Sequence, residues 1–294
     1  MSVSNSIWIR DSFEPFIRDE FKNSLKTYFR SEIMPRKFSD SRLVGEINAW
    51  VKGKTQGKID KIMDYIDRET VLFIINAIYF KGDWVEKFEE SKTRLRNFYL
   101  QNSGKTLVPM MEQGSEFLYF SDKSVEVIRL PYGKNKIAMY VFLPEEGTGV
   151  DSFIQGLEEE KLGGLISNMD MSEIELQIPK LKLAYGNKEL NNALSRLGMG
   201  VAFDENLANL KGIASLSSAN LWISFIDHKA VVEINEKGTE AAAVTSIGPM
   251  ASPIQFGTRR FTANRPYFFV IRDDRSGSIL FMGKILDPTQ LPPQ

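Results

Sequence analysis

The chain has 294 residues, with 37 basic and 38 acidic side chains and a formal net charge of −1. Hydrophobic residues make up 43% and charged residues 26%, a composition typical of a soluble globular protein with a sizeable core. This balance gives no indication of nucleic-acid or membrane-surface binding, and no apolar run is long enough to span a membrane. Because the sequence has no cysteine, disulfides, thiol nucleophiles and cysteine metal sites are excluded.

The first 65 residues are predicted to be mainly helical. Apolar residues recur at helical spacing within 17–29 and again within 43–51. Ser39 or Asp40 is expected to cap the second of these helices, and Gly53 is expected to end it.

From residue 71 onward, strands dominate the prediction. The apolar run 71–80 has the length of a strand that is buried on both faces. Segments 125–130 and 137–143 flank a turn and predict a hairpin. A helix is expected from Asp151 to about residue 165, and the alternation within 174–178 predicts a further strand.

The last third of the chain combines one short helix with long strands. The helix is expected at 190–198, a long strand at 221–234, and a final hairpin from 268–271 and 279–282. No repeat or linker divides the sequence. Helices first and mainly antiparallel strands later predict an α+β fold, in a single domain over 1–294.

Residues 241–258 carry no charge, although the composition would place roughly five charges in a window of that length. Prolines and glycines interrupt the segment as a helix, while its first half alternates as a strand would. A long connection of this kind inside a compact chain is usually functional or disordered. A segment that can be an exposed loop or enter a sheet is a conformational switch.

This segment and its flanks resemble the reactive-centre loop of the serpins, the family of serine-protease inhibitors, with the loop at about 236–258. Further resemblance lies in 76–84, 261–268 and 280–284, so that it covers nearly the whole chain. The hinge of the loop matches almost letter for letter, and its residues are Glu236, Lys237, Gly238, Thr239, Glu240, Ala241, Ala242 and Ala243. In the family, several helices and a strand precede the position of Asn5. The resemblance therefore implies a serpin-like domain that is truncated at its N-terminus.

The resemblance implies an inhibitor that acts as a suicide substrate. A serine protease would form a covalent complex with the loop, which would then insert into the central sheet. The family's usual hinge-to-scissile length places the cut between Ser252 and Pro253, while Met250–Ala251 and Ala251–Ser252 are chemically easier bonds. Small or unbranched apolar residues there favour elastase-like, subtilisin-like or chymotrypsin-like targets. The family also implies a monomer without metal or cofactor, not an enzyme, and favours an extracellular location, although no signal peptide is visible.

Three further residues stand out. His228 is the only histidine, and a lone histidine within a strand is most often a structural hydrogen-bonding group. Its position matches the family's shutter histidine, and Asn76 matches a partner of that histidine. The resemblance assigns another partner, a serine, to the region before this chain. Trp84 matches the breach tryptophan, at the top of the sheet where loop insertion begins.

Other functions remain as alternatives. A non-inhibitory serpin that acts as a carrier or chaperone is the first of them. A hydrolase with a flexible lid is disfavoured, since a catalytic triad would have to use the single histidine. A basic cluster near the second predicted helix, which is either an exposed lysine face or a weak polyanion site, consists of Lys52, Lys54, Lys58 and Lys61.

Overall fold

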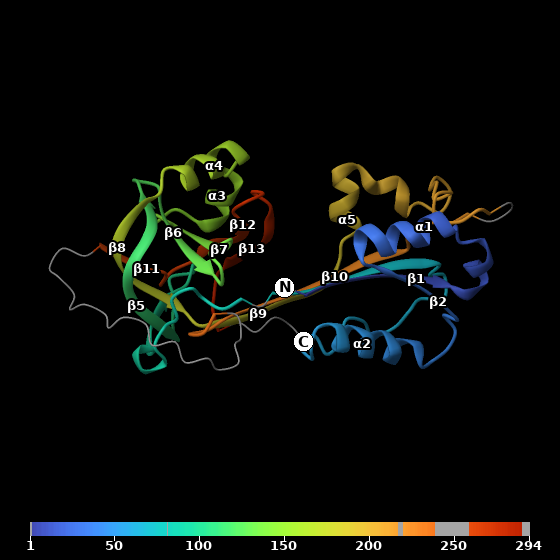
Figure 1. Cartoon of the computed structure of the whole chain (residues 1–294), viewed down its shortest axis with the longest axis horizontal. Coiled ribbons are helices and arrows are strands. Elements are labelled where there is room, and N and C mark those ends of the chain that lie inside the picture. The colour runs from blue at the N-terminus through green and yellow to red at the C-terminus, as the bar shows by residue number, and fades with distance from the viewer. Residues whose placement is uncertain (1, 81, 217–219, 239–258, 290–294) are drawn as a thin grey trace. The chain divides into compact units, whose positions relative to one another are not determined.

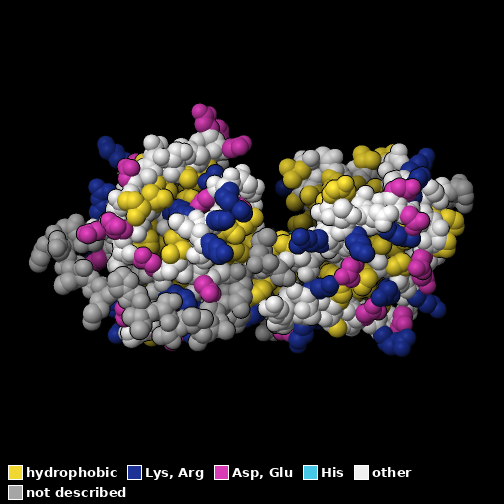
Figure 2. Space-filling view, in the orientation of Figure 1, with side chains coloured by type: hydrophobic (Ala, Val, Ile, Leu, Met, Phe, Trp, Pro, Cys, Tyr) yellow, Lys and Arg dark blue, Asp and Glu magenta, His cyan; other side chains and the backbone are white. Residues whose placement is uncertain are grey.

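The structure, a computed structural model, describes residues 2–80, 82–216, 220–238 and 259–289. These residues form two compact units, which are 2–80 with 183–232, and 82–182 with 233–289 (Figure 1). On the visible face of each unit, Lys and Arg side chains are interspersed with Asp and Glu (Figure 2). Among the described residues, no helix has the length and apolar character to cross a membrane.

The first unit is built on a five-stranded sheet with the order β2-β1-β3-β10-β9. Its strands are β1 (Ser2–Arg10), β2 (Glu32–Arg36), β3 (Leu72–Phe80), β9 (Leu181–Glu189) and β10 (Phe225–Ile234). Strand β1 runs parallel to β2 and antiparallel to β3. Strands β3 and β10 run parallel and pair directly over eight residues of each.

Alternate side chains of each strand point to opposite faces of the sheet. Both faces carry apolar side chains, and helices cover both of them. Trp8 and Phe73 pack with helix α2 (Leu43–Lys54) on one face. Ile9 and Leu72 belong to a cluster on the other face, which α1 and α5 cover (Figure 1). The remaining helical segments of this unit are η1 (Asp11–Phe16), α1 (Asp19–Ser24), η2 (Leu25–Phe29), α5 (Asn191–Leu194), η4 (Ser195–Met199) and η5 (Gly200–Phe203).

The second unit contains an eight-stranded sheet with the order β11-β8-β5-β6-β7-β12-β13, and β4 pairs with β5 off this path. The strands are β4 (Arg94–Tyr99), β5 (Lys105–Ser121), β6 (Val125–Tyr132), β7 (Ile137–Pro144), β8 (Asp170–Pro179), β11 (Arg259–Thr262), β12 (Tyr267–Asp273) and β13 (Ile279–Ile285). Its helical segments are η3 (Glu90–Lys92), α3 (Val150–Gln155) and α4 (Glu159–Ser167). A core around Phe142, Phe153 and Phe268 joins α3 to the sheet.

The α+β class is confirmed, and so are the strand at 71–80 and both predicted hairpins, β6–β7 and β12–β13. The N-terminal part is less helical than predicted, because β1 and β2 also lie there. Helix α2 continues one residue past Gly53, and no side chain caps its start. Asp40 instead accepts a hydrogen bond from the backbone of Arg42, which closes the turn before the helix.

Two predicted elements differ in extent for local reasons. The helix expected from Asp151 is divided into α3 and α4, because the chain leaves the helix at Gly156 and is extended at Glu158. The strand expected from residue 221 begins at Phe225. The residues before it have other partners, since the amide of Ser224 donates to the carbonyl of Leu72 at the end of the sheet.

Candidate functional site

The described part of the predicted hinge, Glu236–Gly238, lies against the segment that follows β3. The amide of Trp84 donates to the carbonyl of Lys237 over 3.2 Å, and the amide of Phe88 donates to the carbonyl of Glu236 over 2.9 Å. The indole Nε1 of Trp84 donates to the carbonyl of Asn235 over 2.9 Å. The carbonyls of three successive residues, 235–237, therefore accept hydrogen bonds from the segment 84–88. The hinge can move away from this segment only when these hydrogen bonds break.

A buried carboxylate holds the same segment from the side. Oε2 of Glu236 lies 2.9 Å from Nζ of Lys180, and Oε1 accepts a hydrogen bond of 2.9 Å from the hydroxyl of Thr93. The Glu236 side chain is only 7% exposed. Burial by itself would raise the pKa of Glu236, but the hydrogen bonds from Lys180, the backbone and Thr93 outweigh burial and lower it. Glu236 is therefore a charged anchor of the hinge in the folded state.

Gly238 occupies a position that only glycine fits. Its φ of +118° lies in the left-handed region, where side chains are strained. A Cβ atom there would lie 2.3 Å from the carbonyl oxygen of Gly82 and 2.6 Å from Cα of Asp83. Gly238 and Asn235 also exchange backbone hydrogen bonds of 3.0 and 3.1 Å, which form a tight turn at the end of the described segment 220–238.

Trp84 is fixed by other rings as well as by its hydrogen bonds. Its ring stacks on Tyr132 at a centroid distance of 4.3 Å and an interplanar angle of 15°. Phe88 approaches its edge at 6.3 Å. Because the side chain is only 4% exposed, Trp84 contributes apolar packing in addition to its hydrogen bond to the hinge.

In the first unit, His228, Asn76 and Asn5 form a row of hydrogen bonds across β10, β3 and β1. His228 and Asn5 are each the direct cross-strand partner of Asn76. The Oδ1 atom of Asn76 accepts from Nδ1 of His228 over 2.6 Å, and its Nδ2 donates to Oδ1 of Asn5 over 2.5 Å. Burial lowers the pKa of His228, which favours the neutral ring. The expected structural hydrogen bond of His228 is thus present.

Sequence reasoning missed Asn5 as a member of this row. The available signal was weak, because a single polar residue near the start of a strand is common. Only the antiparallel register of β1 and β3 places Asn5 opposite Asn76. With Asn5 in place, the amide of Asn76 uses both its acceptor and its donor within the sheet.

The remaining site predictions lie outside the described residues. These are the hinge positions Thr239, Glu240, Ala241, Ala242 and Ala243, and the scissile-bond candidates Met250, Ala251, Ser252 and Pro253. The described chain resumes at Arg259, in the edge strand β11, which pairs in parallel with β8. The described residues include no group of three or more His, Cys, Asp or Glu side chains that could hold a metal ion.

The lysine cluster around α2 already has partners within the first unit. Lys52 lies 2.8 Å from Asp60, Lys54 lies 2.8 Å from Glu32, and Lys61 pairs with Asp64. The ammonium of Lys58 lies 5.9 Å from the centroid of the Tyr79 ring. A polyanion bound at this face would have to compete with three carboxylates for the lysines.

The family model described as serpin (serine protease inhibitor) matches residues 1–288. Human leukocyte elastase inhibitor is 38% identical over 252 residues, which cover 82% of this chain and 65% of that protein. Intracellular coagulation inhibitor 1 of Tachypleus tridentatus is 34% identical over 293 residues, which cover 97% of this chain and 68% of that protein.

Solved structures are similar over almost the whole chain. The crystal structure of tengpin, a thermophilic serpin, in its native state matches with a TM-score of 0.87 and 31% identity, covering 97% of this chain and 73% of that one. Human thyroxine-binding globulin complexed with thyroxine matches with a TM-score of 0.87 and 27% identity, covering 98% of this chain and 75% of that one. The chain spans about two thirds of the length of the curated relatives named above.

Proposed function

The chain belongs to the serpin family, and on that basis we propose that it inhibits serine proteases as a suicide substrate. The observation that carries this proposal is the direct parallel pairing of β3 with β10, the strand that leads into the uncharged segment 241–258. A chain that turns back after β10 runs antiparallel to β10, and therefore also antiparallel to β3. A new strand between the two would thus form antiparallel ladders on both of its edges.

The composition of the hinge supports insertion. Thr239 and the three alanines 241–243 are small enough to be buried between neighbouring strands without a large volume or charge cost. On insertion, each residue would gain backbone pairing and side-chain packing that an exposed loop lacks. The chain before cleavage would then be kinetically trapped above a more stable state, and insertion would release the stored free energy.

The reaction begins as ordinary proteolysis. The protease serine attacks the carbonyl carbon of the scissile bond, the peptide C–N bond breaks, and the new amine takes a proton from the protease's general acid. The N-terminal side of the loop stays bound to the protease as an ester. Insertion of that side would carry the protease away from its docking position before water can hydrolyse the ester. Each molecule of the chain is consumed in one such reaction, so the chain is not an enzyme.

The cleaved bond would lie among Met250, Ala251, Ser252 and Pro253. Pro253 after the cut would hinder most serine proteases, which favours Met250–Ala251 or Ala251–Ser252. No Arg or Lys lies between Lys237 and Arg259, so a trypsin-like protease is disfavoured. The proposed target is therefore elastase-like, subtilisin-like or chymotrypsin-like.

The test is to mix the chain with elastase, subtilisin, chymotrypsin and trypsin and to analyse the products on denaturing gels and by mass spectrometry. We expect a denaturant-resistant adduct with one of the first three, together with a released peptide that identifies the scissile bond. The variant Thr239→Arg should be cleaved without forming an adduct, while Thr148→Arg, in an exposed turn, should behave as the unchanged chain does. Cleavage without adduct by the unchanged, folded chain would contradict inhibition.

A carrier function is the second candidate, and its support is the similarity to thyroxine-binding globulin. A carrier binds its ligand without loop insertion, so Thr239→Arg would leave its binding unchanged. Failure to form adducts, combined with ligand binding that this substitution does not affect, would favour the carrier.

A further inference from the structure

Strand β4 lies at an edge of the sheet in the second unit. Among the strands that the structure describes, it pairs only with β5. The register places Leu95 opposite Pro109, whose carbonyl accepts a hydrogen bond from the amide of Lys180, on the β8 side of β5. Because neighbouring residues of a strand direct their backbone groups to opposite sides, Leu95, Asn97 and Tyr99 direct theirs away from β5.

Two residues of this edge have unpaired backbone groups. The amide of Tyr99 donates to the carbonyl of Asn264 over 2.7 Å, which closes one end of the edge. For Leu95 and Asn97, the described part of the chain supplies neither an acceptor for the amide nor a donor for the carbonyl. These N–H and C=O groups are therefore available to pair with an added strand.

The side chains along this edge form an exposed apolar patch. Leu95 is 67% exposed, Tyr99 is 51% exposed, and Leu107 on β5 is 59% exposed. Cross-strand partners such as Leu95 and Pro109 point to the same face, and alternate residues of each strand share that face. The four side chains therefore lie on one face of the β4–β5 pair.

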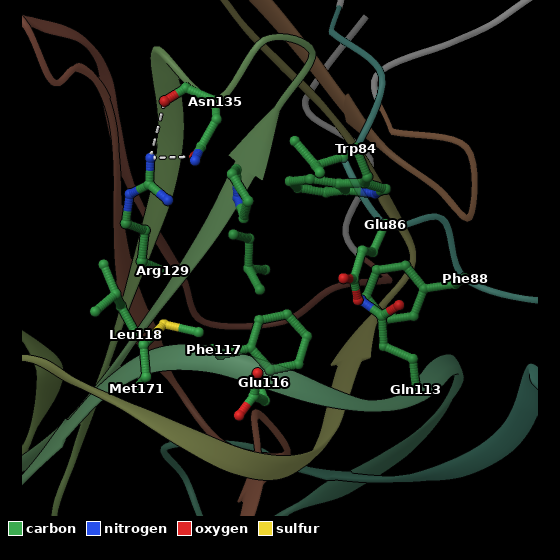
Figure 3. Close-up of a pocket in the computed structure, with 13 residues that line it drawn as sticks. Trp84, Glu86, Phe88, Gln113, Glu116, Phe117, Leu118, Arg129, Asn135 and Met171 are labelled. Atoms are coloured by element: carbon green, nitrogen blue, oxygen red, sulfur yellow. Dashed lines mark hydrogen bonds between the residues drawn. The ribbon is translucent and has the colours of Figure 1, made fainter. Parts of the chain in front are cut away.

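The later part of β5 is covered, in contrast to this hairpin. Phe117 is only 5% exposed and lines a pocket of about 250 Å³ together with Trp84 and Phe88 (Figure 3). Exposed apolar side chains of β5 thus lie in its first part, where β4 is its neighbour. Apolar surface beside an unpaired strand edge is typical of a site for strand addition.

The hairpin carries positive charge on its other face. Residues 94–110 include Arg94, Arg96 and Lys105 but no Asp or Glu. Arg96 lies 2.9 Å from Glu112, whereas Arg94 and Lys105 form no ion pair with a described carboxylate. Since Arg94 and Arg96 alternate with Leu95, a strand added to β4 meets arginines on one face and apolar side chains on the other.

We propose that β4 binds an extended acidic peptide of a partner protein as an added strand. The peptide backbone bonds to the unpaired groups of Leu95 and Asn97, as happens when a peptide extends a sheet. Its residues alternate between apolar and acidic, because a strand has a period of two. The apolar side chains lie beside Leu95, and the carboxylates lie beside Arg94 and Arg96.

A second copy of the chain fits this edge less well than an acidic peptide does. Antiparallel pairing of two β4 strands through Leu95 and Asn97 places the two Arg96 side chains directly opposite each other, and like charges in that position are destabilising. The segment 241–258 of the chain itself carries no carboxylate to offer the arginines. Charge complementarity therefore favours a separate, acidic partner.

The first experiment measures binding to the unchanged chain by calorimetry, with three short peptides whose termini are blocked. One alternates valine and glutamate (SVEVEVS), one has lysine in place of glutamate (SVKVKVS), and one has the acidic composition without the alternation (SEEVVVS). We expect the first peptide to bind at least about tenfold more tightly than either of the others. Equal affinities, or no binding of the first peptide up to about 10 mM, would overturn the proposal.

The second experiment tests backbone pairing with two substitutions of Asn97. Asn97→Pro removes the outward N–H and spares the β4–β5 ladder, since proline is tolerated where a strand N–H faces outward from the sheet edge. It should weaken binding of SVEVEVS by about tenfold or more, whereas Asn97→Ala, which keeps the amide, should change it by less than about threefold. Equal affinities of the two variants would overturn strand addition.

The third experiment tests the charge preference and does not depend on the folding of Asn97→Pro. Arg94→Glu should lower the ratio of the SVEVEVS and SVKVKVS affinities by about threefold or more, while Lys134→Glu, in the exposed β6–β7 turn, should leave it unchanged. An unchanged ratio in Arg94→Glu would overturn the role of the arginines. Self-association of the unchanged chain that Asn97→Pro abolishes would assign the edge to a second copy and overturn the proposal. No protease takes part, so these results are independent of the inhibitory function.

Discussion

Lys180 and Glu236 form an ion pair across 2.9 Å in which the lysine side chain is 46% exposed and the glutamate side chain only 7% exposed. Glu236 belongs to the predicted hinge, and its backbone carbonyl accepts the hydrogen bond from the amide of Phe88. The pair therefore joins a buried charge to the segment that would have to move during loop insertion.

Lys180→Gln should loosen the hinge, because it leaves the buried carboxylate of Glu236 without its cation. We expect a loss of about 1–3 kcal/mol in the free energy of unfolding, measured in urea, and faster hydrogen exchange at the amide of Phe88. Lys92→Gln is a matched control, since Lys92 is also 46% exposed but its partner Glu89 is 60% exposed. Equal effects of the two substitutions would contradict the role of the buried pair.

Gly238→Ala should lower the free energy of unfolding by more than backbone strain alone would. The added methyl group would lie 2.3 Å from the carbonyl oxygen of Gly82, so Gly238 or its neighbours must shift. Gly147→Ala provides the control, since its φ is +88° but no atom lies within 4 Å of the new Cβ. The control should lose about 1–2 kcal/mol from left-handed strain, and Gly238→Ala should lose more. Urea unfolding measures both, and a smaller loss for Gly238→Ala would contradict the close packing of the hinge.

His228→Ala should destabilise the first unit, because it leaves Oδ1 of Asn76 without its donor. The expected loss is about 1–3 kcal/mol, with partial recovery in His228→Gln, whose amide can donate instead. Burial lowers the pKa of His228, so the unfolded chain binds the proton more readily than the folded chain does. Stability should therefore fall as the pH drops below about 6.5, and this component should vanish in His228→Gln. If the unchanged chain and His228→Gln lose stability identically as the pH falls, the contribution of His228 to the pH dependence is contradicted.

Asp227→Asn should stabilise the chain at alkaline pH. Burial, followed by the nearby Glu189 carboxylate, raises the pKa of Asp227 to about 6. The folded chain therefore holds this proton more tightly than the unfolded chain, and stability falls as the pH rises from about 4 to about 6. At pH 8 the variant should be more stable by about 1–2 kcal/mol after allowance for solvent screening, and the difference should close below pH 4.

Urea unfolding at several pH values measures the Asp227 difference. Glu189→Gln should give a smaller gain of the same sign, because it removes only the second cause of the shift. Glu205→Gln, an exposed residue of the same unit, should give none. A variant Asp227→Asn that is less stable than the unchanged chain at pH 8 would show that the carboxylate has a stabilising partner.

Much of the fold follows from local patterns in the sequence. The apolar run at 71–80 became β3, and the hairpin signals around residues 132–136 and 273–277 became β6–β7 and β12–β13. Local patterns failed where other parts of the chain supply the partners. Strand β1 was missed because its pairing with β3 depends on residues about seventy positions away. In the expected strand at 221–234, the amides of Ile223 and Ser224 instead donate to the carbonyls of Ala202 and Leu72.

The sequence by itself determined the α+β class, the family resemblance, the uncharged segment 241–258 and the small residues of the predicted hinge, because these features can be recognised from the composition and spacing of residues that are close in the chain. Only the tertiary structure decided that Glu236 is a buried anchor paired with Lys180, that Gly238 has no room for a Cβ, and that Asn5 completes the row with Asn76 and His228. Burial, desolvation and cross-strand register arise from contacts between residues that are distant in the chain. These contacts hold Glu236, Lys237 and Gly238 in place, and the local sequence pattern does not reveal them.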